Sequence, residues 1–341
     1  MIQVPLVGFL FIACQVQKSP EKVLASQENS RIYKDPMFFI PGQLCQHVRE
    51  IFQDSRGRLW FGTNVYDIML YEGDSLRYIG DKEGVPGGRI TGILEDQTGN
   101  VWFSSAAGLT KYDGKDFSSY GAEEGLKNSE VWSLYLDPKG IFWVGTTEGA
   151  FQFDGERFYP FKIEKGVVPD TVSQFYHERI TAITGDTSGN IWIGTDGFGL
   201  TRYNGLNFET FTKENGLPDN AIGDLMVDSK GNLWIGTCFG GVSRFDGSKF
   251  HNYTREGRVN GVEIAGLYED PEGDVWFCAE NSGVYRFDGS EFYRFQGKGE
   301  SYSNGILSFL KDSEGRFWAG GWGGLFRMTD STLTPVTQKE L

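Results

Sequence analysis

The sequence predicts an all-β protein, a single seven-bladed β-propeller of four-stranded antiparallel blades. An Asp followed by Gly three residues later and by Trp six residues later occurs seven times in the 341 residues. The tryptophans of this pattern are Trp60, Trp102, Trp143, Trp192, Trp234, Trp276 and Trp318. Most of them are about 42 residues apart, which is the period of a four-stranded propeller blade. The 47 Gly residues and the 15% aromatic content fit many tight turns and large buried faces.

The segment that begins at residue 218 shows the four strands expected in one blade. The apolar segment 221–228 is the first strand, "NLWIGT" the second, "GGVSRF" the third and "SKFHNYT" the fourth. An Asp-x-x-Gly turn joins the first two strands, because Asp accepts backbone N–H groups and Gly tolerates the positive φ that closes the turn. An Asp-Gly or Asn-Gly pair, a strong hairpin signal, joins the last two strands in five blades. Blade seven has Asp330 without a following Gly, which predicts a looser last hairpin.

The repeated residues are interpreted as packing elements. A Trp at a fixed strand position in every blade indicates contact between adjacent blades rather than a row of sugar platforms. A Gly two residues after the Trp shares its strand face and leaves room for the neighbouring sheet. These glycines are Gly62, Gly145, Gly194, Gly236 and Gly320. Each turn offers about one carboxylate, whereas a calcium loop places several oxygen ligands within a dozen residues, so no metal or other cofactor is expected.

The chain is expected to divide into four segments. Residues 1–14 form an apolar run that ends in Cys14 and reads as a signal peptide, of the lipoprotein type if Cys14 is lipidated. An ordinary cleaved signal and a misplaced start codon are the alternatives. Residues 15–35 are a polar tether, 36–337 the propeller and 338–341 a tail. Segment 332–337 is expected to complete blade seven, and segment 36–42 to pack along its edge.

The net charge and the spacing of the cysteines argue against two classes of function, nucleic-acid binding and metal binding. The formal net charge of −14 and the pI near 4.8 argue against nucleic acid as a partner, because phosphate binding needs clustered Lys and Arg. No metal-binding spacing such as C-x-x-C is present. Cys45, Cys238 and Cys278 are therefore expected to be free thiols, buried or partly buried.

The repeat resembles that of a known family. The pattern Ile-x-x-Leu-x-x-Asp-x-x-Gly-Asn-Leu-Trp-Ile-Gly-Thr, followed by Gly-Gly-Val-x-Arg-Phe-Asp-Gly and Phe-x-x-Tyr, is similar to the two-component regulator propeller repeat over residues 45–337. The resemblance implies a seven-bladed propeller outside the cytoplasm, like the periplasmic sensing half of hybrid histidine kinases, in which propellers recognise oligosaccharides. The sequence holds one ring and no kinase or DNA-binding segment. We therefore expect this chain to share the fold of that family and its ability to bind a ligand. We do not expect this chain alone to transduce a signal.

Ligand-binding residues are expected where the loop between strands two and three and the loop between blades meet around the channel mouth. Aromatic faces stack on sugar rings, and carboxylates and amides bind hydroxyls. The candidates are Tyr66, Asp67, Arg89, Asn128, Glu148, Asp196, Phe198, Asn220, Phe239, Asn260, Glu263, Glu280, Asn281, Tyr302, Asn304 and Trp322. The connection from blade three to blade four is eight residues longer than the others, and this insertion within 165–178 adds Tyr176 and His177, with Arg179 following. The insertion is either a binding lid or neutral drift.

The channel itself has two expected carboxylates. At the third position of the inner strands five blades carry a small residue, and blades one and five carry Glu50 and Asp224, nearly opposite in a seven-membered ring. Both carboxylates are expected to approach the axis around water or a cation, or else one or both turn towards solvent or a neighbouring Arg such as Arg49.

Three functions remain open at this point. The favoured one is an exported ligand-binding or sensory module, periplasmic or anchored to the outer membrane by lipid, that recognises a small molecule, an oligosaccharide or another envelope component. The second is a protein-interaction scaffold with an envelope protein partner. The third is a lyase similar to virginiamycin B lyase, which is less favoured because the three His residues form no close pair with Glu at the mouth. Enzyme activity is therefore uncertain and less expected than binding.

Overall fold

The computed structural model describes residues 42–64, 68–127, 130–168, 178–295, 305–329 and 331–338. All described residues belong to one compact unit, Tyr33–Leu341. Among the described residues, 28 strands form seven four-stranded sheets. Two short 3₁₀ helices, η1 (Asp81–Glu83) and η3 (Lys213–Asn215), each follow an outer strand.

The sheets follow one another along the chain and form the blades of a propeller. Blade one contains β1 (Val48–Gln53), β2 (Leu59–Thr63), β3 (Ile68–Glu72) and β4 (Ser75–Ile79). Blade two contains β5 (Ile90–Glu95), β6 (Val101–Ser105), β7 (Gly108–Tyr112) and β8 (Phe117–Tyr120). Blade three contains β9 (Val131–Leu136), β10 (Phe142–Thr146), β11 (Gly149–Phe153) and β12 (Phe158–Phe161). Blade four contains β13 (Ile180–Gly185), β14 (Ile191–Thr195), β15 (Leu200–Tyr203) and β16 (Phe208–Phe211). Blade five contains β17 (Ile222–Val227), β18 (Leu233–Thr237), β19 (Val242–Phe245) and β20 (Phe250–Asn252). Blade six contains β21 (Ile264–Glu269), β22 (Val275–Ala279), β23 (Gly283–Phe287) and β24 (Phe292–Phe295), and blade seven contains β25 (Ile306–Lys311), β26 (Phe317–Gly321), β27 (Gly324–Thr329) and β28 (Thr332–Pro335).

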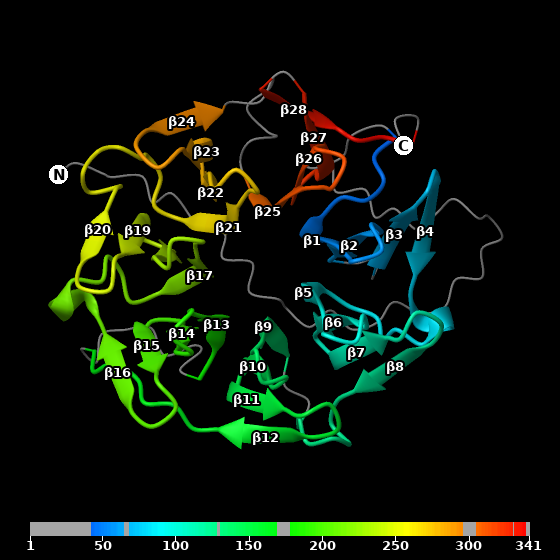
Figure 1. Cartoon of the computed structure of the whole chain (residues 1–341), viewed down its shortest axis with the longest axis horizontal. Helices are drawn as coiled ribbons and strands as arrows, with labels where there is room; N and C mark the ends of the chain where they lie inside the picture. Colours follow the sequence, from blue (N-terminus) through cyan, green and yellow to red (C-terminus); the bar gives the residue numbers. More distant parts are fainter. Residues whose placement is uncertain are drawn as a thin grey trace, which may run out of the picture. The chain divides into compact units, whose positions relative to one another are not determined.

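Neighbouring strands within each blade pair antiparallel in chain order. The first strand of each blade lies beside the central opening and the fourth lies at the rim (Figure 1). The prediction of a single seven-bladed propeller with four-stranded antiparallel blades is confirmed.

The repeated Trp packs between blades, as predicted. Trp60 of blade one is fully buried, and its ring lies 5.2 Å from Phe103 and 5.4 Å from Tyr112 of blade two. Trp234 repeats this contact with Phe287 of the next blade at 5.4 Å. Because these rings are buried, they offer no platform to a ligand, and the seven sheets instead share one continuous set of aromatic interfaces.

The repeated Gly makes room for the adjacent inner strand, also as predicted. A Cβ placed on Gly62 would lie 2.6 Å from Cγ2 of Ile90 in blade two. A Cβ on Gly320 would lie 2.5 Å from Cγ1 of Val48, which joins blade seven to blade one. The absence of a side chain at this position therefore allows neighbouring blades to pack closely, including blades seven and one, which close the ring.

The chain ends meet at blade seven. Strand β28 pairs with β27 and completes the blade, so the predicted role of the C-terminal segment is confirmed. Beyond it, Gln43 forms a β-bridge with Thr337, and the N–H of Gln338 donates to the carbonyl of Gly42 at 3.1 Å. The beginning of the described chain thus lies along the edge of blade seven. The expectation for segment 36–42 also included residues 36–41, which lie outside the described residues, as does Asp330 of the last hairpin.

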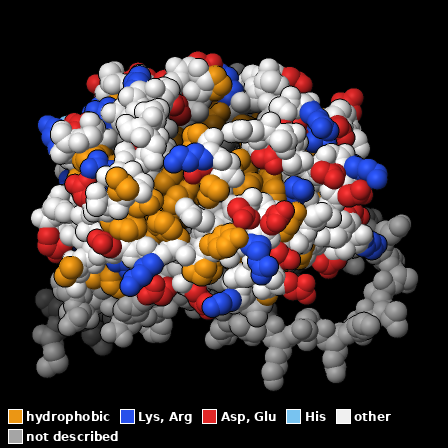
Figure 2. Space-filling view, turned by 60° about the horizontal axis from the view of Figure 1, so that its bottom comes forward, with side chains coloured by type: hydrophobic (Ala, Val, Ile, Leu, Met, Phe, Trp, Pro, Cys, Tyr) orange, Lys and Arg blue, Asp and Glu red, His pale blue; other side chains and the backbone are white. Residues whose placement is uncertain are grey.

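The outer surface carries mixed charge and some exposed aromatic rings. Figure 2, which brings the bottom of Figure 1 forward, shows acidic and basic side chains interspersed around an area where hydrophobic side chains gather. Tyr78, Tyr159 and Tyr293, on the outer strands of blades one, three and six, are each at least 41% exposed. Acidic side chains on this face therefore lie among basic ones and form no separate patch.

Six of the inner strands have a β-bulge directly after their first residue, where the strand begins at the channel mouth. In β1, β5, β9, β13, β17 and β25 the pairing with the second strand shifts directly after the first residue. The residues left out of the pairing are Arg49, Thr91, Trp132, Thr181, Gly223 and Leu307. Bulges of this kind re-aim side chains at the rims of closed sheets.

Candidate ligand site at the channel mouth

Paired positions surround the mouth of the channel. The residue before each inner strand lies beside the residue after the second strand of the same blade, because the backbone of the two strands pairs there. The N–H of Thr147 donates to the carbonyl of Glu130 at 3.0 Å. Equivalent bonds join Asp196 to Arg179, Cys238 to Ala221, Glu280 to Glu263 and Trp322 to Gly305. The fold thus gathers residues from distant parts of the sequence at one end of the ring.

Trp132 is the centre of a cluster of side chains at this mouth. Its indole N–H donates to Oγ1 of Thr147 at 2.9 Å. The guanidinium of Arg89, from blade two, lies 4.1 Å from the ring centroid, and that of Arg179, from blade four, lies 4.7 Å from it. Three consecutive blades therefore converge on one half-buried indole, at distances typical of cation–π contacts.

Each of the two guanidiniums is also held by a carboxylate. Arg89 forms an ion pair with Glu130, and Arg179 forms one with Asp196. Both pairs are partly buried. A guanidinium that is stacked on an indole and paired with a carboxylate loses little freedom when it binds something else, because its position is already fixed.

Arg49 adds a third guanidinium to the same cluster. It occupies the bulge position of β1 that Trp132 occupies in β9. Burial, and secondarily the charge of Arg89, lowers the pKa of Arg49 to about 10, against the opposing charges of Glu50 and Glu130. Within the described chain, Arg49 makes no hydrogen bond and no ion pair, so its charge is balanced only at longer range.

The mouth is acidic near blade six. Burial, followed by a hydrogen bond and charge repulsion from Glu280, raises the pKa of Glu263 to about 7. Cys238 lies close to this pair: burial, followed by the charges of Glu263, Asp196 and Asp219, raises the pKa of its thiol to about 12. A thiol held protonated in this way is a poor nucleophile. Among the described residues Cys45, Cys238 and Cys278 form no disulfide, as predicted.

Glu50 and Asp224 share the channel. Carboxylate Oδ2 of Asp224 accepts the N–H of Leu267 from blade six at 2.8 Å, and Oδ1 accepts the N–H of Leu225 at 2.8 Å. Burial raises the pKa of Asp224 to about 6 despite these bonds. Burial, and then the charge of Asp224, raises the pKa of Glu50 to about 8. Asp224 has therefore turned to the backbone of a neighbouring blade, while its charge still reaches Glu50.

A metal site is not formed in the described part of the chain, where no cluster of three or more His, Cys, Asp or Glu side chains has a suitable arrangement. The repeated Asp is used differently. Oδ1 of Asp54 accepts the N–H groups of Arg56 and Arg58, and Oδ2 accepts the indole N–H of Trp60 at 2.8 Å. The bond from Trp to Asp recurs in all seven blades.

The other predicted site residues have several environments. Asn220 is buried, and its side-chain oxygen accepts the N–H of Lys213 at 2.9 Å, which fixes a loop. Phe239 is 51% exposed, Glu148 and Asn281 are exposed, and Trp322 packs edge to face on His47 at 4.3 Å. Several candidates, including the predicted lipidation site, lie outside the described residues: Cys14, Tyr66, Asp67, Asn128, Tyr176, His177, Tyr302 and Asn304.

The described start of the insertion packs on blade four. Oγ1 of Thr201 donates to the carbonyl of Glu164 at 2.7 Å, and the N–H of Gly166 donates to the carbonyl of Phe198 at 3.1 Å. The ammonium of Lys165 lies 5.2 Å from the ring of Phe198. The ring of Phe198 is thereby covered by a cation.

Sequence reasoning missed Trp132 and Glu130, and it considered Arg49 only as a partner of the channel carboxylates. Trp132 is one of two tryptophans outside the repeat pattern, and it stands one residue after the first apolar residue of its strand. That position is Arg, Thr or Gly in blades one, two and five, so a large ring there was a usable signal. The convergence of Arg89 and Arg179 on it could be seen only in the fold.

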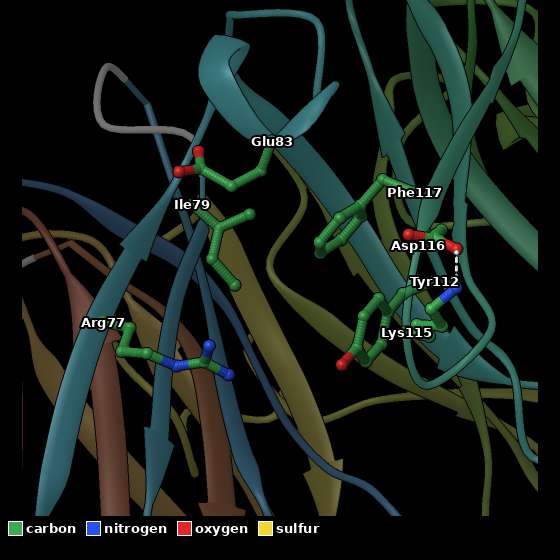
Figure 3. A pocket seen from close by; sticks show the side chains of 7 residues that line it. All are labelled: Arg77, Ile79, Glu83, Tyr112, Lys115, Asp116 and Phe117. Atoms are coloured by element: carbon green, nitrogen blue, oxygen red, sulfur yellow. Dashed lines mark ion pairs between the residues drawn. The ribbon is translucent and has the colours of Figure 1, made fainter.

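A separate groove lies at the outer edge, between blades one and two (Figure 3). It encloses about 340 Å³ and is lined by Arg77, Ile79, Glu83, Tyr112, Lys115, Asp116 and Phe117. The rings of Tyr112 and Phe117 stack on each other, with centroids 4.6 Å apart. These residues belong to β4, η1, the end of β7, the turn that follows it and the start of β8, so the groove is not part of the channel mouth.

Five segments of the chain match the model of one family, described as the two component regulator propeller: residues 42–65, 84–107, 125–148, 177–197 and 216–239. Each segment covers the inner strand, the Asp-x-x-Gly turn and the second strand of one of the first five blades. The chain carries two component regulator propeller repeats. The matched segments contain both paired mouth positions of these blades, so the two component regulator propeller repeat includes the walls of the mouth as well as the packing core.

Solved structures show the same fold. The extracellular domain of a putative hybrid two component system of B. thetaiotaomicron aligns with a TM-score of 0.68 and 23% identity, over 84% of this chain and 39% of that one. Virginiamycin B lyase of Staphylococcus aureus, in a catalytically inactive form, aligns at 0.64 and 14%, over 82% and 93%. PorZ of Porphyromonas gingivalis, a surface component of the type-IX secretion system, aligns at 0.63 and 15%, over 85% and 47%. This chain thus spans less than half of that extracellular domain and of PorZ.

No curated protein matches the sequence. Among the described residues, no helix has the length and apolar character needed to cross a membrane.

Proposed function

We propose that this protein is an exported ligand-binding propeller of the sensory kind, which recognises an oxygen-rich small molecule or oligosaccharide at the channel mouth. The observation that carries the proposal is the convergence of Arg89 and Arg179 on Trp132. Two fixed guanidiniums supply several N–H donors in one place, and hydroxyl and carboxylate oxygens are suitable acceptors. Phe239, exposed on the loop after β18, supplies an apolar face on which a sugar ring can stack.

The proposed location is outside the cytoplasm. The apolar run of residues 1–14 and the Cys14 that ends it support export with a lipid anchor. Membrane contact would then occur only through that anchor, because lipidation attaches a protein without a spanning segment. The repeat family and the fold shared with a bacterial extracellular domain are in keeping with this location. Labelling with radioactive palmitate, with Cys14→Ser as the control, tests the anchor.

Binding is tested on an array of neutral and acidic glycans. The wild-type propeller is expected to bind one class, and Trp132→Ala is expected to weaken binding at least tenfold, because both guanidiniums lose the surface that fixes them. Tyr159→Ala, which removes an exposed ring from the outer strand β12, is the matched control and should bind like the wild type. Equal binding by all three proteins, or no binding at all, would contradict the proposal.

A second candidate function is a protein-interaction scaffold. The specific observation in its favour is the set of exposed tyrosines on outer strands, Tyr78, Tyr159 and Tyr293, since exposed aromatic rings are enriched at protein interfaces. Pull-down from envelope extract with wild type and Tyr159→Ala tests it. A partner retained by the wild type and lost by this variant would favour the scaffold, and a magnesium-dependent activity screen would test the remaining lyase alternative.

A further inference from the structure

The charges of the mouth cluster do not balance. The cluster contains three guanidiniums, those of Arg49, Arg89 and Arg179, and two carboxylates, those of Glu130 and Asp196. Each carboxylate forms an ion pair with one of the last two arginines. Arg49 is left without an ion pair or hydrogen bond to any described residue, although it lies within electrostatic range of Arg89 and Glu130.

The nearest carboxyl does not compensate for this charge. Glu50 follows Arg49 in β1, but its pKa of about 8 leaves it mainly protonated at neutral pH. Arg49, with a pKa of about 10, is still charged there. An enclosed charge without a partner is costly, and the cost is removed when an anion reaches it. The excess of one positive charge matches a monoanion better than a dianionic phosphate.

We propose that the channel mouth binds the carboxylate of its ligand on the guanidinium of Arg49, next to Arg89, so that the ligand is an acidic rather than a neutral molecule. The inference deepens the proposed function and rests on it. The planar guanidinium can hold a carboxylate through two parallel N–H···O bonds, which fixes the orientation of the ligand in the channel as well as its charge. The protonated Glu50 side chain can donate one further O–H to the same group.

The test compares carboxylates with neutral molecules of the same shape. Two pairs of probes are titrated by calorimetry: galacturonate against neutral galactose, and N-acetyl-dialanine against its amide. The first pair represents a sugar acid and the second a peptide carboxylate, so the pair that binds identifies the source of the anion. The proteins are wild type, Arg49→Gln and Arg49→Lys. Arg157→Gln, which removes the same charge from an exposed hairpin, is the control.

The expected result is that wild type and Arg157→Gln bind one carboxylate at least tenfold more tightly than its neutral counterpart, with a preference that decreases as salt is added. Arg49→Gln should abolish the preference. Arg49→Lys should retain part of it, because the charge remains while the paired N–H groups are lost. Thermal melting verifies that each variant is folded.

Three results would overturn the inference: equal affinity for a carboxylate and its neutral counterpart, an undiminished preference in Arg49→Gln, or binding of neither pair. They are distinguishable from failure of the proposed function. If a neutral glycan binds on the array, and Trp132→Ala weakens it while Arg49→Gln does not, the mouth is a ligand site without the proposed anion subsite. If no glycan and no probe binds, both proposals fail.

Discussion

The indole N–H of Trp234 donates a hydrogen bond to Oδ2 of Asp228 at 2.9 Å, and the corresponding bond is present in every blade. Oδ1 of Asp228 accepts the N–H groups of Lys230 and Asn232 at the same time. The Asp therefore shapes the turn and also fixes the ring that enters the next blade. This double use explains why Asp and Trp are always six residues apart.

Replacement of Asp228 by Ala is expected to destabilise the propeller by about 1 to 3 kcal/mol, the cost of leaving buried donors unsatisfied. Urea unfolding measures the change. Asp246→Ala is the matched control: Asp246 caps an exposed hairpin and binds no Trp, so its loss should cost less. Equal losses in the two variants would show that the bond to Trp234 contributes little.

Trp234→Ala is expected to cost about 3 to 5 kcal/mol, the range for deletion of a large buried aromatic side chain. Trp234 is 1% exposed and contacts Tyr253 and Phe287. Trp234→Phe, which retains part of the packing and loses the N–H, should fall between wild type and Trp234→Ala in melting temperature. A melting temperature unchanged in Trp234→Ala would show that the ring is not part of the core.

Gly320→Ala is expected to destabilise the closure of the ring by about 1 to 3 kcal/mol, as overpacking does elsewhere. The added methyl group would meet Val48 at 2.5 Å and Ser308 Oγ at 2.9 Å. Cys278→Ala, at the same strand position in blade six, is the control because a Cβ is already accommodated there. Thermal unfolding should separate the variants, and a stable Gly320→Ala would mean that blades seven and one can separate without cost.

Glu50→Gln is expected to stabilise the protein at high pH only. The pKa of Glu50 is about 8 in the folded protein and near 4.5 in the unfolded chain. Between these values the folded state binds more protons, so wild-type stability falls as pH rises from about 4.5 to 8. Gln does not titrate. The variant should therefore match the wild type at pH 4 and exceed it at pH 9, by up to a few kcal/mol, in urea unfolding at several pH values. A difference that does not vary with pH would contradict the raised pKa.

The contact between Arg89 and Trp132 should appear as a coupling energy. A double-mutant cycle with Arg89→Met and Trp132→Leu is expected to give about 0.5 to 2 kcal/mol, the range of partly buried cation–π pairs. The same cycle with Arg77→Met, on outer strand β4, should give none. Zero coupling for Arg89 would mean that the indole does not fix this guanidinium.

The fold could be read from the sequence because each blade repeats the same local chemistry. Asp228, Gly231 and Trp234 specify a turn and a packed ring within seven residues, and Gly236 makes room for the neighbour. Seven copies of such a unit can bury their faces only against each other, so repeat number fixed the blade number. Arg89, Arg179 and Asp196 were also foreseeable as mouth residues, because the loops that carry them follow from the strand order.

The composition of the candidate site was decided by the tertiary structure. Arg89, Trp132 and Arg179 are separated by more than forty residues from one to the next, and only the packing of three consecutive blades places them at contact distance. The same holds for Glu50 and Asp224, whose shared channel raises a pKa that no local pattern indicates. The sequence by itself determined the blade, since the bonds that define it are local. The partners across the mouth depend on long-range packing, and so does the unbalanced charge of Arg49.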